Sequence, residues 1–289
     1  MKAVTNKIYV KKLRRVVEMN LGYMTNAFGP LVGSGGGVTS AKDIRYETMG
    51  DDIDAIKKIA DCGYNSIEMF DGNLDRYAGN EKELKDMLNK HNVSLLGVYI
   101  GANFIYQDAL EDELWRINKI TQLASEFGAK HIVLGGGAVR ANGNTEEDYV
   151  LLGKGLDRAK EIVESHGLIA SYHPHLGSMV ETPEQIDKIF SITSIPFCPD
   201  IAHLAAGGGD PLEIVKKYYE RIKYVHLKDL KDGEFVPLGK GSLELSEIIK
   251  FLKEQDYQGD WLVEIDGYSG DPQEACQTSY EFLKGKLID

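Results

Sequence analysis

One repeating pattern constrains the fold more than any other feature of this sequence. A short run of β-branched or aromatic residues is followed by a polar loop and then by an amphipathic segment that ends near a glycine. Such runs predict strands that alternate with helices. The predicted strands are 16–25, 64–70, 93–101, 130–135, 168–173, 195–200, 223–228 and 259–264. This alternation produces parallel strands with right-handed crossovers, and eight such units make an α/β fold of the (β/α)8 or TIM barrel type.

Several of the predicted helices have recognisable ends. Thr182-Pro183-Glu184-Gln185 opens one helix with an N-cap hydroxyl, a first-turn proline and the glutamine of a capping box. Asp210-Pro211 opens the next helix in the same way. A glycine, as a left-handed C-terminal cap requires, follows each of the segments 51–62, 110–127 and 145–166. The last two helices are predicted at 244–255 and 271–286.

The chain is predicted to form one domain. No low-complexity linker or break in composition divides its 289 residues, so the barrel is expected over 1–289, with 1–15 as an N-terminal extension. A doubly wound open sheet is the alternative, and it would place ligands at a single switch point. Polar residues instead recur at the ends of four successive predicted strands. This distribution favours the closed barrel, in which all strand ends converge on one mouth.

The polar strand ends are candidate ligands of a divalent metal ion. His173 and His175 end the fifth predicted strand, Asp200 ends the sixth, His226 lies near the end of the seventh, and Glu264 ends the eighth. A catalytic metal ion takes three or four imidazole and carboxylate ligands and leaves positions open for water or substrate. A lone histidine is more often a buried, hydrogen-bonded residue. Recurrence on successive strands favours the metal site.

Two further polar residues follow these strand ends. His203 lies three residues after Asp200, where it could contact a substrate or orient a ligand. The alternative is a loop histidine exposed to water. Lys228 lies two residues after His226 and hence on the same side of the strand, where it could bind substrate and stabilise an enolate or alkoxide oxygen. Its alternative role is a rim lysine paired with Asp229.

The N-terminal half offers weaker candidates. Glu68 in the second predicted strand and Tyr99 in the third could bind hydroxyl groups of a polyol substrate. The alternatives are a salt-bridged rim carboxylate and a packed aromatic ring. The glycine-rich loop 33–37 lacks the Lys-Ser or Lys-Thr of a phosphate-binding loop, so we interpret it as a mobile lid over the mouth.

Composition excludes several classes of partner. A net charge of -12 would repel a phosphate backbone, so we expect no nucleic acid. No apolar run approaches the ~20 residues that span a bilayer, and residues 1–15 lack the apolar region of a secretory signal. We therefore expect a cytoplasmic protein without membrane contact. The three cysteines are scattered singly, which fits a reducing compartment, and are predicted to pack as small apolar residues.

The segment from about residue 168 to 264 resembles the sugar phosphate isomerase/epimerase superfamily, whose members fold as xylose-isomerase-like barrels. Three motifs carry this resemblance: Asp200-Ile201-Ala202-His203, Tyr224-Val225-His226-Leu227-Lys228-Asp229 and Trp261-Leu262-Val263-Glu264. Within the superfamily, the segment 172–182 looks most like the inosose dehydratases, which carry a histidine-rich segment, Leu-Gly and a Thr-opened helix. The resemblance implies that Asp200, His226 and Glu264 are metal ligands.

The sequence departs from its resembling families at two places. Many epimerases of the superfamily carry a glutamate at the end of strand five, where this chain has histidine. Inosose dehydratases tend to carry a long insertion after the His-Leu-Lys-Asp segment, where this chain has the short turn Asp232-Gly233-Glu234. Imidazole, with a pKa near ~6.5, is suited to protonate a departing hydroxide. The first departure therefore favours elimination over epimerisation.

These observations lead to one hypothesis: a metal-dependent dehydratase of inosose type that acts on a keto-sugar or keto-cyclitol. His175 and His203 are the acid and base candidates, Glu264 is the remaining carboxylate beside the reacting carbon, and Lys228 supports the oxyanion. The ion is expected to be Mn²⁺ ahead of Co²⁺, Fe²⁺, Zn²⁺ or Mg²⁺. Its ligands would be His173, Asp200, His226 and Glu264.

Three alternatives remain open at this stage. The first is a sugar or sugar-phosphate epimerase or an aldose-ketose isomerase, and the second is a sugar-binding barrel without a metal. The third is an abasic-site endonuclease with three zinc ions, which would need histidines where this chain has Glu68 and Tyr99. Dimers are common in the resembling family, so a homodimer or homotetramer is compatible with the resemblance, although no apolar helix requires one.

Overall fold

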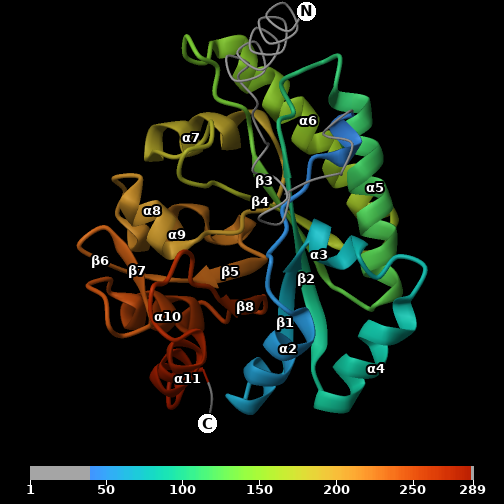
Figure 1. Ribbon diagram of the computed structural model, residues 1–289. Helices are drawn as coiled ribbons and strands as arrows, with labels where there is room; N and C mark the ends of the chain where they lie inside the picture. The colour runs from blue at the N-terminus through green and yellow to red at the C-terminus, as the bar shows by residue number, and fades with distance from the viewer. Residues whose placement is uncertain (1–39, 288–289) are drawn as a thin grey trace, which may run out of the picture. The chain divides into compact units, whose positions relative to one another are not determined.

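The computed structural model describes residues 40–287, which include every predicted strand except the first. The predicted strand 16–25, the extension 1–15 and the predicted lid 33–37 lie outside the described residues. Four strands form a parallel sheet in the order β1 (Ser66–Phe70), β2 (Ser94–Ala102), β3 (His131–Gly136) and β4 (Ile169–His173) (Figure 1). The hydrophobic pattern predicted the bounds of each of these strands to within two residues.

The wall of strands continues through a less regular segment. β5 (Tyr224–Leu227) pairs in parallel with β8 (Asp260–Val263), as predicted. The regular strand predicted at 195–200 is wrong, because only isolated parallel bridges at Phe197 and Asp200 occur there. Pro196 and Pro199 explain the difference, since proline has no amide hydrogen to donate to a strand ladder. The segment still lies between β4 and β5, because Phe197 forms bridges on both sides.

The helices follow the strands in the predicted chain order. They are α2 (Asp52–Asp61), α4 (Glu81–His91), α5 (Leu110–Glu126), α6 (Glu146–Ser165), α7 (Pro183–Ile192), α9 (Pro211–Tyr218), α10 (Leu245–Glu254) and α11 (Pro272–Leu283). Two short helices and two 3-10 turns were not predicted: α3 (Asp71–Asp75), α8 (Ile201–Ala206), η2 (Ala41–Asp43) and η3 (Tyr219–Arg221). Figure 1 shows α4 and α5 along the outer side of β2, with α7 to α10 on the opposite side of the molecule.

The predicted helix ends are confirmed. The Thr182 hydroxyl accepts a hydrogen bond from the Gln185 amide, and the Gln185 side chain accepts one from the Thr182 amide, which completes the capping box of α7. Asp210 caps α9 through its side chain. The three glycines after α2, α5 and α6 have positive φ values of 106°, 76° and 81°, at Gly63, Gly128 and Gly167.

A small antiparallel hairpin follows β5. It consists of β6 (Asp229–Lys231) and β7 (Glu234–Val236), joined by Asp232 and Gly233, which both have positive φ. Two consecutive positive φ angles are the geometry of the tight turn that fits the twist of a hairpin. The predicted turn is therefore confirmed, whereas the pairing of the strands that flank it was not predicted.

Two hydrophobic clusters show which side of each strand faces which layer. The larger cluster includes fully buried residues such as Val98 and Leu134 and fills the space between the strands and the helices. The smaller one contains Tyr99, Val133 and Tyr224, which alternate with the first set along the strands. This inner cluster is small because polar residues and glycines occupy most other inward positions.

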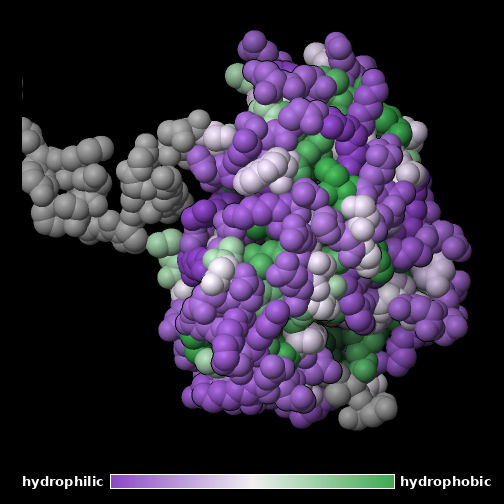
Figure 2. Space-filling model, turned by 90° about the vertical axis from the view of Figure 1, so that its right-hand side faces the viewer, coloured by the Kyte–Doolittle hydropathy of each residue, from purple (hydrophilic) through white to green (hydrophobic). Residues whose placement is uncertain are grey.

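The face of the molecule seen in Figure 2 is mostly polar. Among residues 40–287, no helix combines the length and the hydropathy that crossing a bilayer requires. Figure 2 shows that the face on the right of Figure 1 is largely hydrophilic, with only small hydrophobic areas between the side chains that cover it. The apolar sides of the helices on this face therefore point inward.

Candidate metal centre and its surroundings

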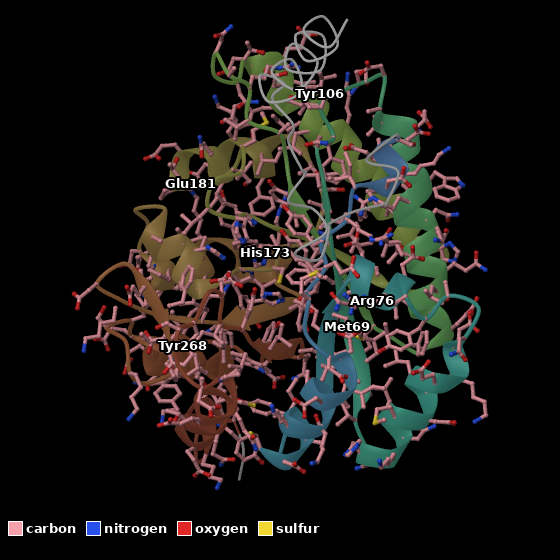
Figure 3. The ribbon with its side chains drawn as sticks, in the orientation of Figure 1. Met69, Arg76, Tyr106, His173, Glu181 and Tyr268 are labelled. Carbon is pink, nitrogen blue, oxygen red and sulfur yellow. The ribbon has the colours of Figure 1, made fainter. Side chains whose placement is uncertain are left out.

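The carboxyl ends of β4, β5 and β8 meet the start of α8 at one group of side chains. Figure 3 shows His173 near the centre of the molecule, at the end of β4. Four residues that the sequence singled out from separate strand ends can each offer one ligand atom, and these atoms all lie within 4.8 Å of one another: His173, Asp200, His226 and Glu264. The fold thus brings together all four predicted ligands at a spacing that suits one metal ion.

Asp200 is held in place by the helix that it begins. Its Oδ1 atom accepts hydrogen bonds from the amides of Ala202 and His203, each at 2.9 Å, and so caps α8. Its Oδ2 atom lies 2.8 Å from Lys228 Nζ. A parallel backbone bridge to His226 fixes Asp200 beside β5, and both side chains are fully buried.

His173 has the character of a ligand without a protein partner. The residue is 1% exposed, and neither ring nitrogen has a hydrogen-bond partner among the described residues. Burial lowers the pKa of His173 well below its usual value, so the ring is neutral and keeps a lone pair on one nitrogen. Buried polar atoms without partners are rare in folded proteins. A metal ion at the four-residue group would satisfy one of these nitrogens, so the residues present fit such an ion.

His226 lies between two carboxylates. Its Nδ1 atom is 2.7 Å from Glu264 Oε2, and its Nε2 atom is 3.4 Å from Glu68 Oε1. Burial opposes a charged ring, but Cys198 and the carboxylates of Glu68 and Glu264 raise the pKa of His226. Glu264 itself is one-quarter exposed, which leaves one side of the group open. His226 and Glu264 would both be ligands of a divalent ion, and binding of the ion would require loss of a proton from this pair.

Lys228 is the fully buried cation of the site. Its Nζ atom lies 2.8 Å from Asp200 Oδ2, 3.2 Å from Glu264 Oε1 and 2.7 Å from Asp266 Oδ2. Although burial opposes the charge, these carboxylates raise the pKa of Lys228, so the ammonium stays charged. The alternative rim pairing is wrong, because Asp229 Oδ2 instead accepts hydrogen bonds from two loop amides.

His175 and His203 form a pair beside the four-residue group. Their ring centroids are 4.0 Å apart. His175 Nδ1 lies 2.8 Å from the Leu176 carbonyl oxygen, and His203 Nε2 lies 3.1 Å from Lys228 Nζ. His203 is 3% exposed, so the alternative of a solvent-exposed loop histidine is wrong. Burial and the neighbouring His203 lower the pKa of His175.

Aromatic rings line the side of the site next to β1 and β2. Tyr99 packs edge-to-face against His173, Phe70 and Tyr46, with centroids 5.6 Å apart in each pair. Position 101 must be glycine here, because an added Cβ would lie 2.1 Å from the Tyr46 ring. Tyr99 is 8% exposed, in keeping with the packed alternative; a contact of its hydroxyl with substrate stays a prediction.

Glu68 is placed deeper than a rim residue. It lies in the middle of β1, its side chain is 9% exposed, and Nε2 of His226 lies 3.4 Å from its Oε1 atom. The alternative of a salt-bridged rim carboxylate is therefore wrong, and a contact with a substrate hydroxyl stays a prediction.

Sequence reasoning assigned no role to two residues of the site. Asp266 contacts both Lys228 and His203, and these two groups, against the opposing effect of burial, hold the pKa of Asp266 well below its usual range. Its position two residues after Glu264 was an available signal, because alternate residues of an extended chain face the same side. Tyr46 lies outside the described strands and helices, so no periodicity could have indicated it.

Two other donor groups share His173. One contains His175 and His203, and the other contains Cys198 and His226. Burial raises the pKa of the Cys198 thiol to about 11, so the sulfur keeps its proton and is a poor ligand. Cys198 packs in the inner hydrophobic cluster, as the sequence predicted for the cysteines.

Known proteins with similar sequences align along most of this chain. An inosose dehydratase of Bacillus thuringiensis (strain Al Hakam) is 30% identical over 267 residues, which cover 80% of this chain and 88% of that protein. An inosose dehydratase of Geobacillus kaustophilus (strain HTA426) is 28% identical over 269 residues, with coverages of 81% and 85%.

Solved structures support the barrel fold. A probable 3-DHS dehydratase of Bacillus anthracis, 14% identical, superposes with a TM-score of 0.69 over 82% of this chain and 95% of that chain. A 3-keto-D-glucoside 4-epimerase of E. coli, 16% identical, gives 0.69 over 83% and 97%. The profile of the family described as "Xylose isomerase-like TIM barrel" matches residues 56–286. The chain therefore belongs to the xylose isomerase-like TIM barrel family.

Proposed function

We propose that the protein is a divalent-metal-dependent lyase that removes water from a keto-cyclitol of inosose type or from a related keto-sugar. One observation carries the proposal: a four-residue donor group, His173, Asp200, His226 and Glu264, lies directly beside a pair of imidazoles. The relatives named inosose dehydratase, which align along four-fifths of the chain, support this choice of substrate class.

The four-residue group would hold one divalent ion. Two imidazoles with two carboxylates suit Mn²⁺, Co²⁺, Fe²⁺ or Zn²⁺, and less readily Mg²⁺; we expect Mn²⁺. When bound, the ion would act as a Lewis acid that polarises the substrate carbonyl. The remaining residues must take the adjacent proton and deliver one to the leaving hydroxyl.

His175 is the base in this proposal. The Leu176 carbonyl can only accept a hydrogen bond, so Nδ1 of His175 carries the proton and Nε2 keeps the lone pair. The lowered pKa of His175 keeps its ring neutral at neutral pH. Its Nε2 atom can therefore remove a proton from the carbon next to the carbonyl.

His203 is the acid. The Lys228 ammonium has only hydrogens to offer, so it donates to Nε2 of a neutral His203, and the ring proton then lies on Nδ1. That Nδ1 atom is buried and has no hydrogen-bond partner among the described residues. It can donate its proton to the departing hydroxyl, which leaves as water. The resulting His203 imidazolate lies against the Lys228 ammonium, and the adjacent His175, which has taken the proton from carbon, returns a proton to it.

Lys228 and Glu264 shape the electrostatics of the reacting carbon. The three N–H groups of Lys228 already face four protein groups, so support of an oxyanion would be exerted through its charge rather than through a new hydrogen bond. The one-quarter exposed Glu264 faces both the candidate metal position and the open side of the group. Both roles depend on a substrate bound over His173.

The test is a reaction of the Mn²⁺-loaded protein with 2-keto-myo-inositol and with a panel of ketohexoses and 3-keto-sugars. Formation of an α,β-unsaturated ketone with loss of water supports the lyase. Interconversion of epimers without loss of water would instead favour the epimerase alternative. The structural similarity to a 3-keto-D-glucoside 4-epimerase is the observation behind that alternative. A protein that binds these sugars but turns over none, with or without metal, would contradict the proposal.

A further inference from the structure

A set of buried polar side chains lies inside the barrel, next to the candidate metal centre. These side chains have no role in the proposed reaction. Glu68, His131 and Tyr224 all face this interior, and each has a buried polar atom without a hydrogen-bond partner among the described residues. Tyr224 stacks on His131 at 4.3 Å and packs edge-to-face on His226 at 5.1 Å. Of these three residues, Glu68 is the one whose carboxylate lies beside a ring nitrogen of a candidate ligand, His226.

The backbone is built to accommodate Glu68 at this depth. Glu68 faces inward because it alternates with Ile67 and Met69, which belong to the larger hydrophobic cluster between the strands and the helices. The register of β1 against β2 shifts between Ile67 and Glu68, so that Glu68 pairs with Gly97. A Cβ atom at position 97 would lie 2.7 Å from Glu68 Oε2. The absence of a side chain at Gly97 therefore provides the space in which the carboxylate lies.

The two nitrogens of His226 face different carboxylates. Nδ1 faces Glu264, which belongs to the four-residue group. Nε2 has no hydrogen-bond partner among the described residues, and Glu68 Oε1 lies 3.4 Å from it. A neutral imidazole carries one proton, so a carboxylate that accepts from Nε2–H leaves the lone pair on Nδ1. Histidine ligands in metal sites commonly donate their other N–H to a carboxylate, which fixes the ring and increases its basicity.

We propose that Glu68 is a positioning residue, whose carboxylate accepts a hydrogen bond from Nε2–H of His226 and thereby directs the Nδ1 lone pair at the candidate metal position. This inference rests on the proposed function, because it takes His226 as a metal ligand. It gives Glu68 a role different from contact with a substrate hydroxyl. The role also explains why a carboxylate is retained inside a barrel, where burial of a charge is costly.

Cys198 is a second neighbour of His226, and its effect on the ring must be distinguished from that of Glu68. The thiol is fully buried, and its sulfur lies within 4.8 Å of a ring nitrogen of His226. A neutral thiol is a weak acceptor, whereas a carboxylate forms a hydrogen bond about twice as strong as a neutral one. Glu68 is therefore the partner expected to orient the ring, and Cys198→Ala is the matched control.

The experiment compares the intact protein with its Glu68→Leu, Glu68→Gln and Cys198→Ala variants. Zn²⁺ affinity is measured by competition with a chromophoric chelator, and the Nε2–H proton of His226 is observed by NMR in the Zn²⁺-loaded proteins. We expect Glu68→Leu to weaken Zn²⁺ binding about 10- to 100-fold and to move the Nε2–H resonance upfield. Glu68→Gln, whose amide oxygen still accepts, should retain most of the affinity with a smaller shift, and Cys198→Ala should match the unmodified protein.

The outcomes separate this inference from the proposed function. If the unmodified protein binds no Zn²⁺, the metal-dependent function is wrong. If His226→Ala binds Zn²⁺ equally well, His226 is not a ligand and this inference is wrong, whereas a metal at the group of His173, His175 and His203 is not excluded. If binding requires His226 but Glu68→Leu changes neither the affinity nor the resonance, the positioning role is wrong. Should Glu68→Leu fail to fold, the upfield shift in the isosteric Glu68→Gln protein decides, and an unchanged resonance there would overturn the inference.

Discussion

The two walls of the candidate site differ in chemistry. The ionisable wall comes from β4, α8, β5 and the end of β8 and carries imidazoles, carboxylates and one ammonium group: His173, His175, Asp200, His203, His226, Lys228, Glu264 and Asp266. The aromatic wall comes from β1, β2 and the segment before α2, and consists of Tyr46, Phe70 and Tyr99. Only the ionisable wall can hold a cation and move protons. The aromatic wall offers ring faces, which suit the C–H faces of a sugar ring.

This difference indicates that one side of the barrel mouth would carry the groups that react and the other side the rings that contact the substrate. Glycine at positions 101 and 135 lets the rings of the aromatic wall pack against the strands themselves, since an added Cβ at either position would lie within about 2 Å of Tyr46 or Tyr99. On the ionisable wall, by contrast, the charged side chains are held in place by contacts with groups of opposite charge. Substitutions on the aromatic wall should therefore alter substrate binding, and substitutions on the ionisable wall should alter turnover.

The largest effect is expected for His226→Ala on the ionisable wall. Loss of one of four ligands should reduce bound Mn²⁺ from one equivalent to a small fraction, with turnover falling in parallel. Metal analysis of the purified, reconstituted protein measures this. A variant that keeps its metal at the original affinity would instead assign the ion to the group of His173, His175 and His203.

The next effect concerns the imidazole pair. His175→Gln and His203→Gln should each lower kcat by about 10²- to 10⁴-fold, the usual contribution of a general base or acid, without loss of metal. Solvent exchange in D₂O separates the roles. His203→Gln should still exchange the substrate proton next to the carbonyl, because the base remains, whereas His175→Gln should not. The reverse pattern would interchange the two assignments.

The pH dependence of turnover follows from the lowered pKa of His175. A base must be unprotonated, so activity is present above its pKa and is lost as the pH falls through it. Because burial and His203 lower that pKa, the acidic limb of kcat/KM should lie below ~6.5, the ordinary imidazole value. A profile measured from pH 5 to 9 checks this, and an acidic limb above pH 7 would exclude His175 as the base.

The sequence predicted the ionisable wall far better than its surroundings, for a physical reason. His173, Asp200, His226 and Glu264 are found from chain position alone, because the carboxyl ends of parallel strands meet in any barrel. The neighbours of Glu68 could not be predicted, since the register shift between β1 and β2 that pairs Glu68 with Gly97 leaves no mark in the hydrophobic pattern. Tertiary packing determines such contacts.

Tertiary packing also explains the features that the sequence analysis predicted wrongly or missed. Pro196 and Pro199 argued against a regular strand at 195–200, yet the segment keeps its place because its neighbours on both sides bridge to it. Asp266 stood one alternation beyond Glu264 and was readable from the sequence. Tyr46 was not readable, because a residue between regular elements takes its position from what it packs on, here Phe70 and Tyr99.

A moderate effect is expected on the aromatic wall. Tyr46→Ala removes a half-exposed ring that stacks on Phe70 at 5.8 Å, so KM should rise about 2- to 10-fold while kcat changes little. Tyr46→Phe keeps the ring and serves as the control. Steady-state kinetics with 2-keto-myo-inositol measures the split. A fall in kcat with unchanged KM would remove the distinction between the two walls.

The smallest effect is expected at Gly97, where the two walls are coupled. Gly97 belongs to β2, which carries the aromatic wall, yet an added Cβ there would lie 2.7 Å from Glu68 Oε2 and 3.3 Å from Tyr224. A carboxylate at the end of a flexible side chain can move aside, so Gly97→Ala should fold with little loss of stability. The displaced carboxylate would contact His226 less well, so Zn²⁺ affinity should fall about 10-fold or less.

A double-mutant cycle isolates this coupling. In a Glu68→Ala background there is no carboxylate to displace, so adding Gly97→Ala should leave Zn²⁺ affinity unchanged. Equal losses in both backgrounds would mean that the alanine acts through the barrel wall in general rather than through Glu68. If the cycle shows the expected coupling, a strand of the aromatic wall contributes to the ionisable wall by leaving room for its supporting carboxylate.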